Sequence, residues 1–277
     1  MEIKIQRNIH VPSPKTRTLV ADAFYLESKE KLPLVVFIHG YKGYKDWGAW
    51  NLVAKSFAEA GFYFVKFNFS HNGMSLDNQT DFDDLEAFAE NNYSKEMADV
   101  KAILAYFTQQ PEVDASELNL IGHSRGGGIA IIEAFENESI HHLITWAGVE
   151  TLDRFPKNDA FKEWKESGVY SVVNGRTGQK MPHYFQWYKD FSENRSRFDV
   201  ESSFEQLKAL PLIIHGTNDE AVSVQAAHNL DQWNPKSELF LIENANHTFG
   251  AKEPWEENFL PEHLKIAVQK SIEFLKS

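Results

Sequence analysis

The pentapeptide at residues 122–126, Gly-His-Ser-Arg-Gly, places a serine between two glycines. It directly follows the apolar run at residues 118–121 and opens an apolar, glycine-rich segment that predicts a helix. A strand, a tight turn and a helix in this order expose a serine hydroxyl at the edge of a sheet, beside a helix N-terminus that favours negative charge. Ser124 is therefore a candidate nucleophile. A glycine-rich turn that binds a phosphate is the alternative interpretation.

A serine hydroxyl is a weak nucleophile at neutral pH, so it needs a base, and the base needs an acid that orients it. Among the eleven histidines, His247 lies in a short loop between a predicted strand and the last predicted helix. Asp219 follows another predicted strand, and its neighbour Glu220 is the alternative acid. The chain order Ser124, Asp219, His247 is one of the known orders of a catalytic triad.

Acyl transfer through a serine also needs two N–H groups that meet the negative charge developing on the carbonyl oxygen. The backbone N–H of Arg125, directly after the serine, is one candidate. Tyr41, in the loop after the predicted strand at residues 34–38, is the candidate for the other. We expect His123 beside the nucleophile and His215 packed in the core. This chemistry requires no metal or organic cofactor.

The rest of the chain predicts an α/β fold that can position these residues. The segments at residues 2–11 and 19–26 predict two strands at the edge of a sheet, after which strands and helices alternate. The further strands are expected at residues 34–38, 62–69, 118–121, 142–147, 211–215 and 238–242. The helices are expected at residues 49–60, 94–110, 224–233 and 261–276, with one more opening at Ser124. This alternation favours a mostly parallel central sheet covered by helices on both faces.

One segment interrupts the alternation. Roughly sixty residues separate Gly148 from Leu210, where a simple α/β connection needs about fifteen. The segment is rich in aromatic residues, and Asn174-Gly175 is a turn signal that indicates a hairpin. We interpret residues 150–210 as an inserted cap or lid, and residues 1–149 and 211–277 as the core. A decorated crossover that only thickens the core is the alternative.

The composition excludes several classes of function. With 28 Lys and Arg against 40 Asp and Glu, the formal net charge of the 277-residue chain is −12. This charge repels phosphate backbones and anionic lipids, so we expect no nucleic-acid partner and no membrane partner. There is no cysteine, which excludes thiolate metal sites and a cysteine nucleophile. The first residues show no signal peptide, so a cytoplasmic location is expected. The oligomeric state is not indicated.

Taken together, these motifs resemble the α/β-hydrolase superfamily. The matching segments are residues 39–43, 67–75 and 122–127, with the loops that contain Asp219 and His247. Within the superfamily the chain is similar to bacterial serine esterases grouped with dienelactone hydrolases, feruloyl (cinnamoyl) esterases and prolyl-oligopeptidase-type enzymes. The resemblance implies Ser124 as nucleophile, Asp219 as acid and His247 as base. It also implies an oxyanion hole formed by the N–H groups of Tyr41 and Arg125, and a cap at the position of the insertion.

The chain departs from this group in two ways. A dienelactone hydrolase usually presents a cysteine nucleophile, and this chain has no cysteine. Residues 70–73, Ser-His-Asn-Gly, replace an arginine-and-glycine pattern that is common after the corresponding strand.

The expected function is a serine hydrolase that cleaves a small-molecule carboxylic ester through an acyl-enzyme. The aromatic residues of the cap favour medium acyl or phenolic-acid esters over highly charged substrates. One alternative is a serine peptidase or aminoacyl hydrolase, in which Glu150 could hold the ammonium group of the substrate. Acyl transfer to an alcohol is another alternative. A non-catalytic binding protein with the same fold is a third.

Overall fold

The computed structural model describes residues 2–277 and contains a main sheet of eight strands. In spatial order the strands are β1 (Ile3–Val11), β2 (Leu19–Leu26), β4 (Tyr63–Asn68), β3 (Leu32–Ile38), β5 (Val113–His123), β6 (Ile140–Trp146), β9 (Leu210–Gly216) and β10 (Glu238–Ile242). β1 and β2 pair in the antiparallel sense, as do β2 and β4, whereas all pairs from β4 to β10 are parallel. The predicted α/β fold with a mostly parallel sheet is confirmed.

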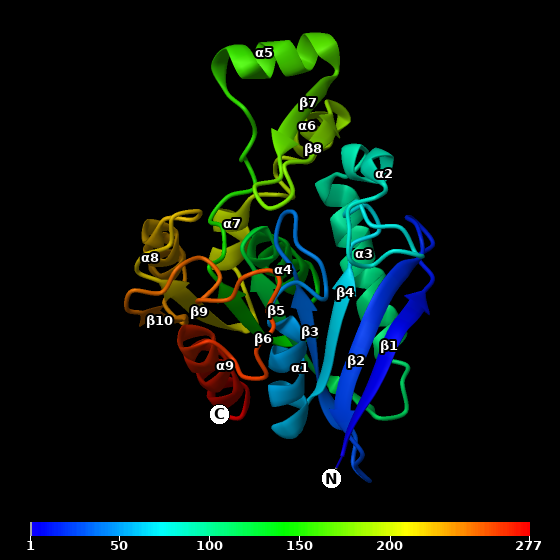
Figure 1. Cartoon of the computed structure of the whole chain (residues 1–277). Helices are drawn as coiled ribbons and strands as arrows, with labels where there is room; N and C mark the ends of the chain where they lie inside the picture. Colours follow the sequence, from blue (N-terminus) through cyan, green and yellow to red (C-terminus); the bar gives the residue numbers. More distant parts are fainter. Residues whose placement is uncertain (1) are drawn as a thin grey trace.

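Helices cover both faces of this sheet (Figure 1). One core contains apolar side chains of α1 (Trp50–Glu59) and α9 (Glu262–Leu275). The other core contains those of α3 (Tyr93–Phe107), α4 (Arg125–Glu136) and α8 (Val224–Trp233). Because both faces are buried, the central parallel strands are continuous apolar runs rather than alternating ones.

The sequence-based placement of β2 at the edge of the sheet was wrong, because β2 lies between β1 and β4. Its Asp22 is buried and accepts hydrogen bonds from Lys66 Nζ on β4 at 2.7 Å and from Arg7 Nη1 on β1 at 2.7 Å. Lys45 Nζ, from the loop after β3, lies 3.1 Å from the same carboxylate. Burial opposes the ionisation of Asp22, but the charges of Lys66 and Lys45 hold its pKa well below the usual range. The ion cluster ties the loop after β3 to the sheet.

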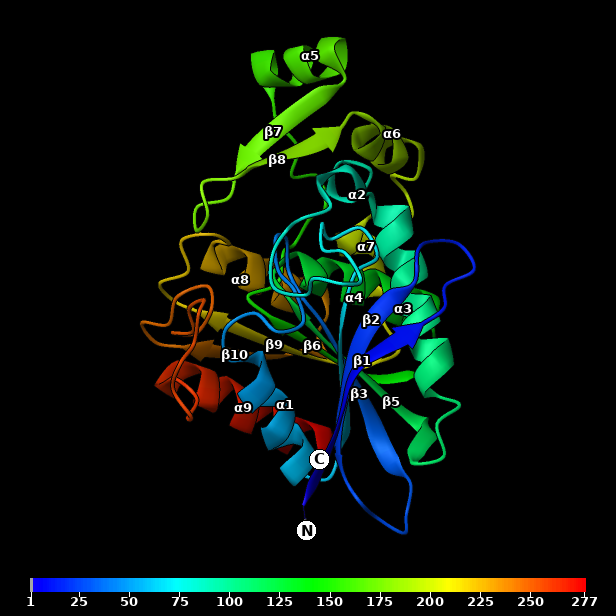
Figure 2. The same cartoon turned by 45° about the vertical axis from the view of Figure 1, so that its right-hand side comes forward.

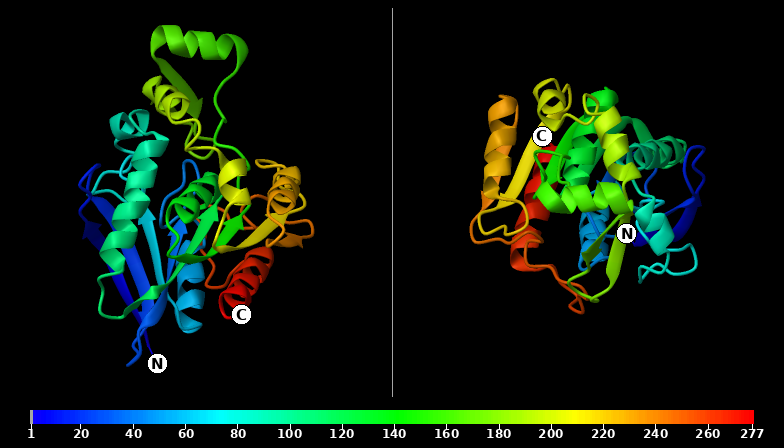
Figure 3. Two further views of the ribbon diagram at one scale, coloured as in Figure 1. Left: turned by 180° about the vertical axis from the view of Figure 1, so that it is seen from behind. Right: turned by 90° about the horizontal axis from the view of Figure 1, so that it is seen from above.

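The long connection between β6 and β9 forms a separate layer. It contains α5 (Asn158–Ser167), β7 (Val169–Val173), β8 (Lys180–Tyr184), α6 (Gln186–Glu193) and α7 (Val200–Glu205). β7 and β8 form an antiparallel hairpin, with α5 above it in the view of Figure 2. Figures 1 and 3 show α5, the hairpin and α6 beyond one end of the main sheet, above the ends of the parallel strands, while α7 returns to contact α4.

The loop after β4 contains a short helix that the sequence did not predict. This helix, α2 (Leu85–Ala89), packs against β8 of the long connection. Its N-cap, Asp84, accepts a hydrogen bond from the backbone N–H of Ala87 at 2.9 Å.

No helix within residues 2–277 combines the length and the apolar character needed to cross a membrane.

Candidate active site

Ser124 occupies a strained turn between β5 and α4, with φ of 55° and ψ of −121°. For a residue with a β-carbon this conformation costs on the order of 1–3 kcal/mol, so the surrounding structure must hold it. The backbone N–H of Ser124 donates to the carbonyl of Trp146 at 2.9 Å. Its own carbonyl accepts from Gly127 N at 2.9 Å and from Val149 N at 3.1 Å. These bonds fix the turn, and the side chain of Ser124 reaches a cavity.

The glycines around Ser124 are required by close backbone packing. A β-carbon on Gly126 would lie 2.3 Å from the carbonyl oxygen of Ile38 on β3. A β-carbon on Gly122 would lie 2.3 Å from the carbonyl oxygen of Gly126. Both distances are far below van der Waals contact, so neither position accepts a larger residue without moving the turn. The spacing of the two glycines in the sequence therefore reflects steric necessity.

Asp219 and His247 form a hydrogen-bonded pair at the ends of β9 and β10. Asp219 Oδ2 accepts from His247 Nδ1 at 2.8 Å, and Oδ1 accepts from the backbone N–H groups of Ala221 and Val222, each at 2.8 Å. The buried His215 Nε2 lies 3.3 Å from Oδ2 and 2.9 Å from the Val222 carbonyl, so it donates toward both oxygens. Burial opposes ionisation, but the hydrogen bonds from His215 and His247 hold the pKa of Asp219 below its usual range. The acid is therefore ionised.

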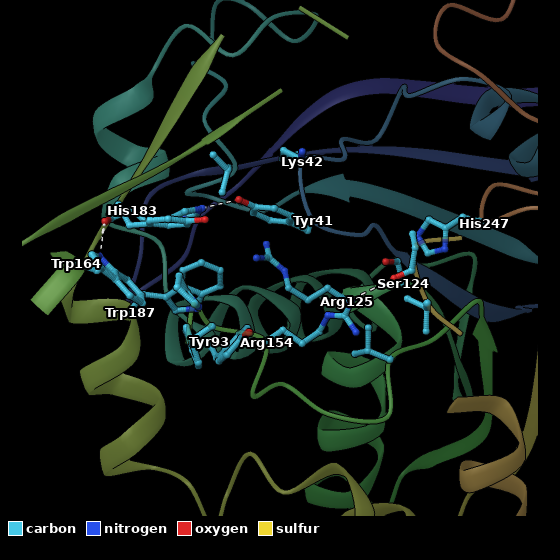
Figure 4. Close-up of a pocket in the computed structure, with 17 residues that line it drawn as sticks. Tyr41, Lys42, Tyr93, Ser124, Arg125, Arg154, Trp164, His183, Trp187 and His247 are labelled. Atoms are coloured by element: carbon cyan, nitrogen blue, oxygen red, sulfur yellow. Dashed lines mark hydrogen bonds between the residues drawn. The ribbon is translucent and has the colours of Figure 1, made fainter. Parts of the chain in front are cut away.

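An ionised Asp219 fixes the tautomer of His247. The proton stays on Nδ1, which leaves the lone pair of Nε2 available for a second partner. Ser124 and His247 line the same cavity, and Figure 4 shows their side chains next to each other. Among the described residues no hydrogen bond joins the Ser124 hydroxyl to the His247 ring. The structure thus brings the three predicted residues together, with one of the two expected hydrogen bonds formed.

His123, next to Ser124 in the chain, contacts His247. Its Nε2 donates to the backbone carbonyl of His247 at 3.0 Å, and the two ring centroids lie 4.9 Å apart. Burial lowers the pKa of His123 to about 3, so its ring is neutral at physiological pH.

The loop after β3 passes directly beside Ser124. A β-carbon on Gly40 would lie 2.9 Å from Ser124 Cβ, and the loop is held by a hydrogen bond from Gly43 N to Gly40 O at 3.0 Å. Within residues 2–277, the backbone N–H groups of Tyr41 and Arg125 donate no hydrogen bond. Both N–H groups belong to residues that line the cavity with Ser124. An oxyanion hole needs two such free N–H donors near the nucleophile, so the predicted roles of Tyr41 and Arg125 stay a prediction.

A cavity of about 610 Å³ extends from Ser124 under the long connection. Several aromatic side chains line it: Tyr41, Tyr93, Phe155, Trp164, Tyr170 and Trp187. Its charged lining residues are Lys42, Arg125 and Arg154, and no Asp or Glu is among the described lining residues. The sequence analysis predicted the aromatic character of the cavity but not its positive charge.

The side chain of Tyr41 connects the loop after β3 to the β7–β8 hairpin. Burial raises the pKa of Tyr41 and lowers that of His183 to about 3, so the phenol and the imidazole are both neutral at physiological pH. The distance between Tyr41 Oη and His183 Nε2 is 2.6 Å. The backbone carbonyl of His183 accepts from Trp164 Nε1 at 2.9 Å. Sequence reasoning missed His183, whose partner lies 142 residues away.

Arg125 has a buried side chain with a buried partner, and sequence reasoning missed this pair as well. Its Nη2 donates to Glu96 Oε1 on α3 at 2.6 Å. The guanidinium carbon lies 4.8 Å from the ring centroid of Tyr41 and 5.6 Å from that of Trp187. Both distances permit cation–π contact. Arg125 therefore reaches from the position next to Ser124 into the aromatic part of the cavity (Figure 4).

Comparison with protein-family models matches residues 21–166 to the dienelactone hydrolase family, which is more than half of the chain. A curated relative is an uncharacterized peptidase, YtmA, of Bacillus subtilis, 28% identical over 152 residues. That alignment covers 52% of this chain and 53% of the relative, so the chain spans about half the length of the curated protein it matches.

Solved structures share the fold over nearly the whole chain. Est1E from Butyrivibrio proteoclasticus with ferulic acid bound superposes with a TM-score of 0.74 at 20% identity, covering 97% of this chain and 98% of Est1E. Dienelactone hydrolase from Anabaena variabilis superposes with a TM-score of 0.66 at 15% identity, covering 100% of this chain and 98% of that protein.

Proposed function

The chain belongs to the dienelactone hydrolase family, and from this premise we propose that it is a serine hydrolase that cleaves carboxylic esters through an acyl-enzyme. One observation carries the proposal. The hydrogen-bonded pair of Asp219 and His247 lies beside Ser124, which a strained turn presents to a cavity. A structural aspartate and histidine would not need a serine in a strained conformation next to them.

In the proposed reaction, Ser124 Oγ attacks the ester carbonyl carbon while His247 Nε2 accepts the hydroxyl proton. The N–H groups of Tyr41 and Arg125 bind the oxyanion of the tetrahedral intermediate. The C–O bond to the alcohol then breaks, and the leaving alkoxide takes the proton from His247. Water, deprotonated by His247, attacks the acyl-enzyme, and the carboxylic acid leaves as Ser124 regains its proton. Asp219 stabilises the charged imidazole in both halves of the reaction.

The cavity supports an acyl group of medium length or an aryl acyl group. Its aromatic side chains offer an apolar surface against which such groups lose water favourably. The ferulic acid bound to the structurally similar Est1E supports a phenolic-acid ester in particular. We propose residues 150–210 as the cap that separates this acyl group from solvent.

A peptidase is the second candidate, because YtmA is described as a peptidase. A peptidase that reads a free amino terminus needs a carboxylate near the substrate ammonium. Glu150, the residue predicted for this task, accepts a hydrogen bond from Asn229 on α8 and does not line the cavity. The cations around the cavity would repel an ammonium group, so the ester hydrolase remains the better proposal.

The proposal is tested with p-nitrophenyl esters from acetyl to decanoyl, a ferulate ester and aminoacyl anilides. We expect turnover of the esters, and a loss on the order of 10⁶-fold in kcat for Ser124→Ala. Ser139→Ala, which changes an exposed serine between α4 and β6, is the matched control and should retain full activity. Turnover of anilides alone would favour the peptidase instead. Ester turnover that survives in Ser124→Ala would contradict the serine mechanism.

A further inference from the structure

Ser124 also lines a second cavity, of about 220 Å³, which is smaller than the cavity under the long connection. Tyr41, Lys42 and His247 line both cavities, so the two meet at the nucleophile and its base. The second cavity lies between the loop after β3, the tip of the β7–β8 hairpin and the loop after β10, each of which contributes lining residues. A substrate whose carbonyl group lies at Ser124 can therefore extend into both cavities.

The second cavity is placed to receive the alcohol part of an ester. The acyl and alcohol parts leave the carbonyl carbon in different directions, and the larger cavity offers the aromatic surface proposed for the acyl part. The alcohol oxygen must lie next to His247, which returns a proton to it when the C–O bond breaks. The second cavity is lined by His247, by its chain neighbour Thr248 and by His123, whose ring contacts that of His247. Thr248 and His123 do not line the larger cavity.

Two donors from different segments lie at the second cavity. Asn174 Oδ1 accepts from the backbone N–H of Arg176 at 3.0 Å, which fixes the amide so that its NH₂ group is the free end. Within residues 2–277 Nδ2 has no acceptor, although Asn174 is only 7% exposed. Lys42 Nζ lies 3.4 Å from the carbonyl oxygen of Val173, the residue before Asn174. The ammonium group and the amide are therefore neighbours across the gap between the loop and the hairpin.

Lys42 is a cation without a counter-charge. It forms no ion pair in the part of the chain that the structure describes, and burial lowers its pKa. No Asp or Glu is among the described lining residues of the second cavity. An anionic group there would gain the attraction of the ammonium group and a hydrogen bond from Asn174, and no lining carboxylate would repel it. An alkyl group of the same size would leave both donors without a partner.

We propose that the second cavity binds the alcohol part of the substrate, and that Lys42 and Asn174 select an alcohol part that carries a carboxylate. This inference rests on the proposed ester hydrolysis, and it adds the alcohol half of the substrate to the acyl half proposed above. The preferred substrates are then esters formed with the hydroxyl group of a hydroxy acid, rather than simple alkyl esters.

The experiment compares three esters of 3-phenylpropanoic acid whose alcohol parts share one skeleton: 3-carboxypropyl, 4-oxopentyl and 4-methylpentyl. They end in a carboxylate, a neutral carbonyl and a branched alkyl group. All three form the same acyl-enzyme, so differences in kcat/KM come from the alcohol part alone. Charge-assisted hydrogen bonds predict that kcat/KM for the carboxypropyl ester exceeds that for the methylpentyl ester about tenfold to a hundredfold. Equal values for all three, or the highest value for a neutral ester, would overturn the inference.

Asn174→Asp assigns the selectivity to the second cavity. The new carboxylate can still accept from Arg176 N, so the turn is retained, but a negative charge replaces the NH₂ donor. The preference for the carboxypropyl ester should be lost. The kcat/KM ratio between methyl 3-phenylpropanoate and methyl acetate should stay unchanged, because Asn174 does not line the larger cavity. A changed acyl ratio with an unchanged alcohol ratio would mean that the cavities hold the opposite parts of the ester.

Thr177→Asp is the matched control, because it places the same charge on an exposed residue of the same turn, outside both cavities. It should keep the preference within about threefold. Lys42→Met should remove the preference, whereas Arg154→Met should keep it. Arg154 lines only the larger cavity, and Figure 4 shows it on the opposite side of that cavity from Lys42. Loss of the preference in either control would contradict the assignment.

Binding separates this inference from the proposed function. The three esters are titrated calorimetrically into Ser124→Ala and into Ser124→Ala with Asn174→Asp. Tighter binding of the carboxypropyl ester to the first protein, lost in the second, supports the inference even if no ester is turned over, and only the proposed hydrolysis then fails. Equal binding of the three esters, together with equal turnover by the unchanged protein, would overturn the inference while ester hydrolysis stands.

Discussion

The two walls of the cavity use their polar groups in opposite ways. On the wall formed by the sheet edge, Asp219 accepts hydrogen bonds from His247, Ala221 and Val222, and His215 also donates toward it. On the wall formed with the long connection, Arg125 Nη2 and His183 Nε2 have protein partners, whereas Arg125 Nη1 and His183 Nδ1 have none among the described residues.

We interpret this difference as a division of roles, in which one wall carries out the reaction and the other selects the substrate. Asp219, both of whose oxygens have hydrogen-bond partners, holds the His247 ring without reorganisation, which is what a group that orients a base needs. Donors without partners gain a hydrogen bond only when a ligand brings the acceptor, so they discriminate between ligands. Changes on the sheet-edge wall should therefore alter kcat for every ester. Changes on the opposite wall should alter the ratio between esters.

The largest effect in this comparison is expected for Asp219→Asn. The amide can still accept from Ala221 and Val222, but its NH₂ group cannot accept the proton of His247 Nδ1. The imidazole then loses the required tautomer, and kcat should fall about 10⁴-fold for all esters alike. The measurement is kcat across the ester panel.

Glu220→Gln is the control for this change, because Glu220 is the neighbouring carboxylate and is exposed. It should retain kcat within a few-fold. A larger loss in Glu220→Gln than in Asp219→Asn would show that the acid had been assigned to the wrong residue.

A smaller effect is expected for Gly40→Ala, which disturbs the loop beside Ser124. The new β-carbon would lie 2.9 Å from Ser124 Cβ and 3.2 Å from the carbonyl oxygen of His123, so the loop must move. A displacement of the Tyr41 N–H by about 1 Å should lower kcat about 10²-fold. Gly175→Ala is the control, because nothing lies within 4 Å of a β-carbon there. Full activity in Gly40→Ala would exclude this loop from the oxyanion hole.

Much of the fold could be predicted because its signals are local. Buried parallel strands read as apolar runs, and helices as apolar residues at a spacing of three and four. The ends of parallel strands meet at one edge of the sheet, so loops after different strands could be expected to converge there. Asp219 and His247, 28 residues apart, are indeed hydrogen-bonded at this edge.

What the sequence did not predict depends on packing between distant segments. β2 lies inside the sheet, where its buried Asp22 is paired with lysines from two other segments. Arg125 pairs with Glu96 on another helix, and Tyr41 with His183 on the hairpin. No hydrophobic periodicity in the sequence indicates that the residues of such a pair are in contact. The sequence therefore predicted the sheet-edge wall better than the opposite wall, where the unpaired donors lie.

The smallest predicted effect concerns how the free energy of unfolding depends on pH through His183, which belongs to the wall formed with the long connection. Burial lowers the pKa of His183 to about 3 from an ordinary value of 6.5. Between these values the unfolded chain binds more protons than the folded protein, so stability rises with pH and is lost as pH falls below about 6.5. In His183→Gln this contribution is absent, while the amide can still accept from Tyr41. The free energy of unfolding should then fall less between pH 7 and pH 5, by about 2 kcal/mol.

The measurement is urea unfolding of both proteins at pH 5, 6 and 7, with His10→Gln as the control because His10 is exposed on β1. The control should show the pH dependence of the unchanged protein. The same pH dependence in His183→Gln would mean that His183 accepts a proton inside the folded protein. Its Nε2–H would then donate to Tyr41 Oη, so in acid the hydrogen bond between the hairpin and the loop beside Ser124 would persist with His183 as the donor.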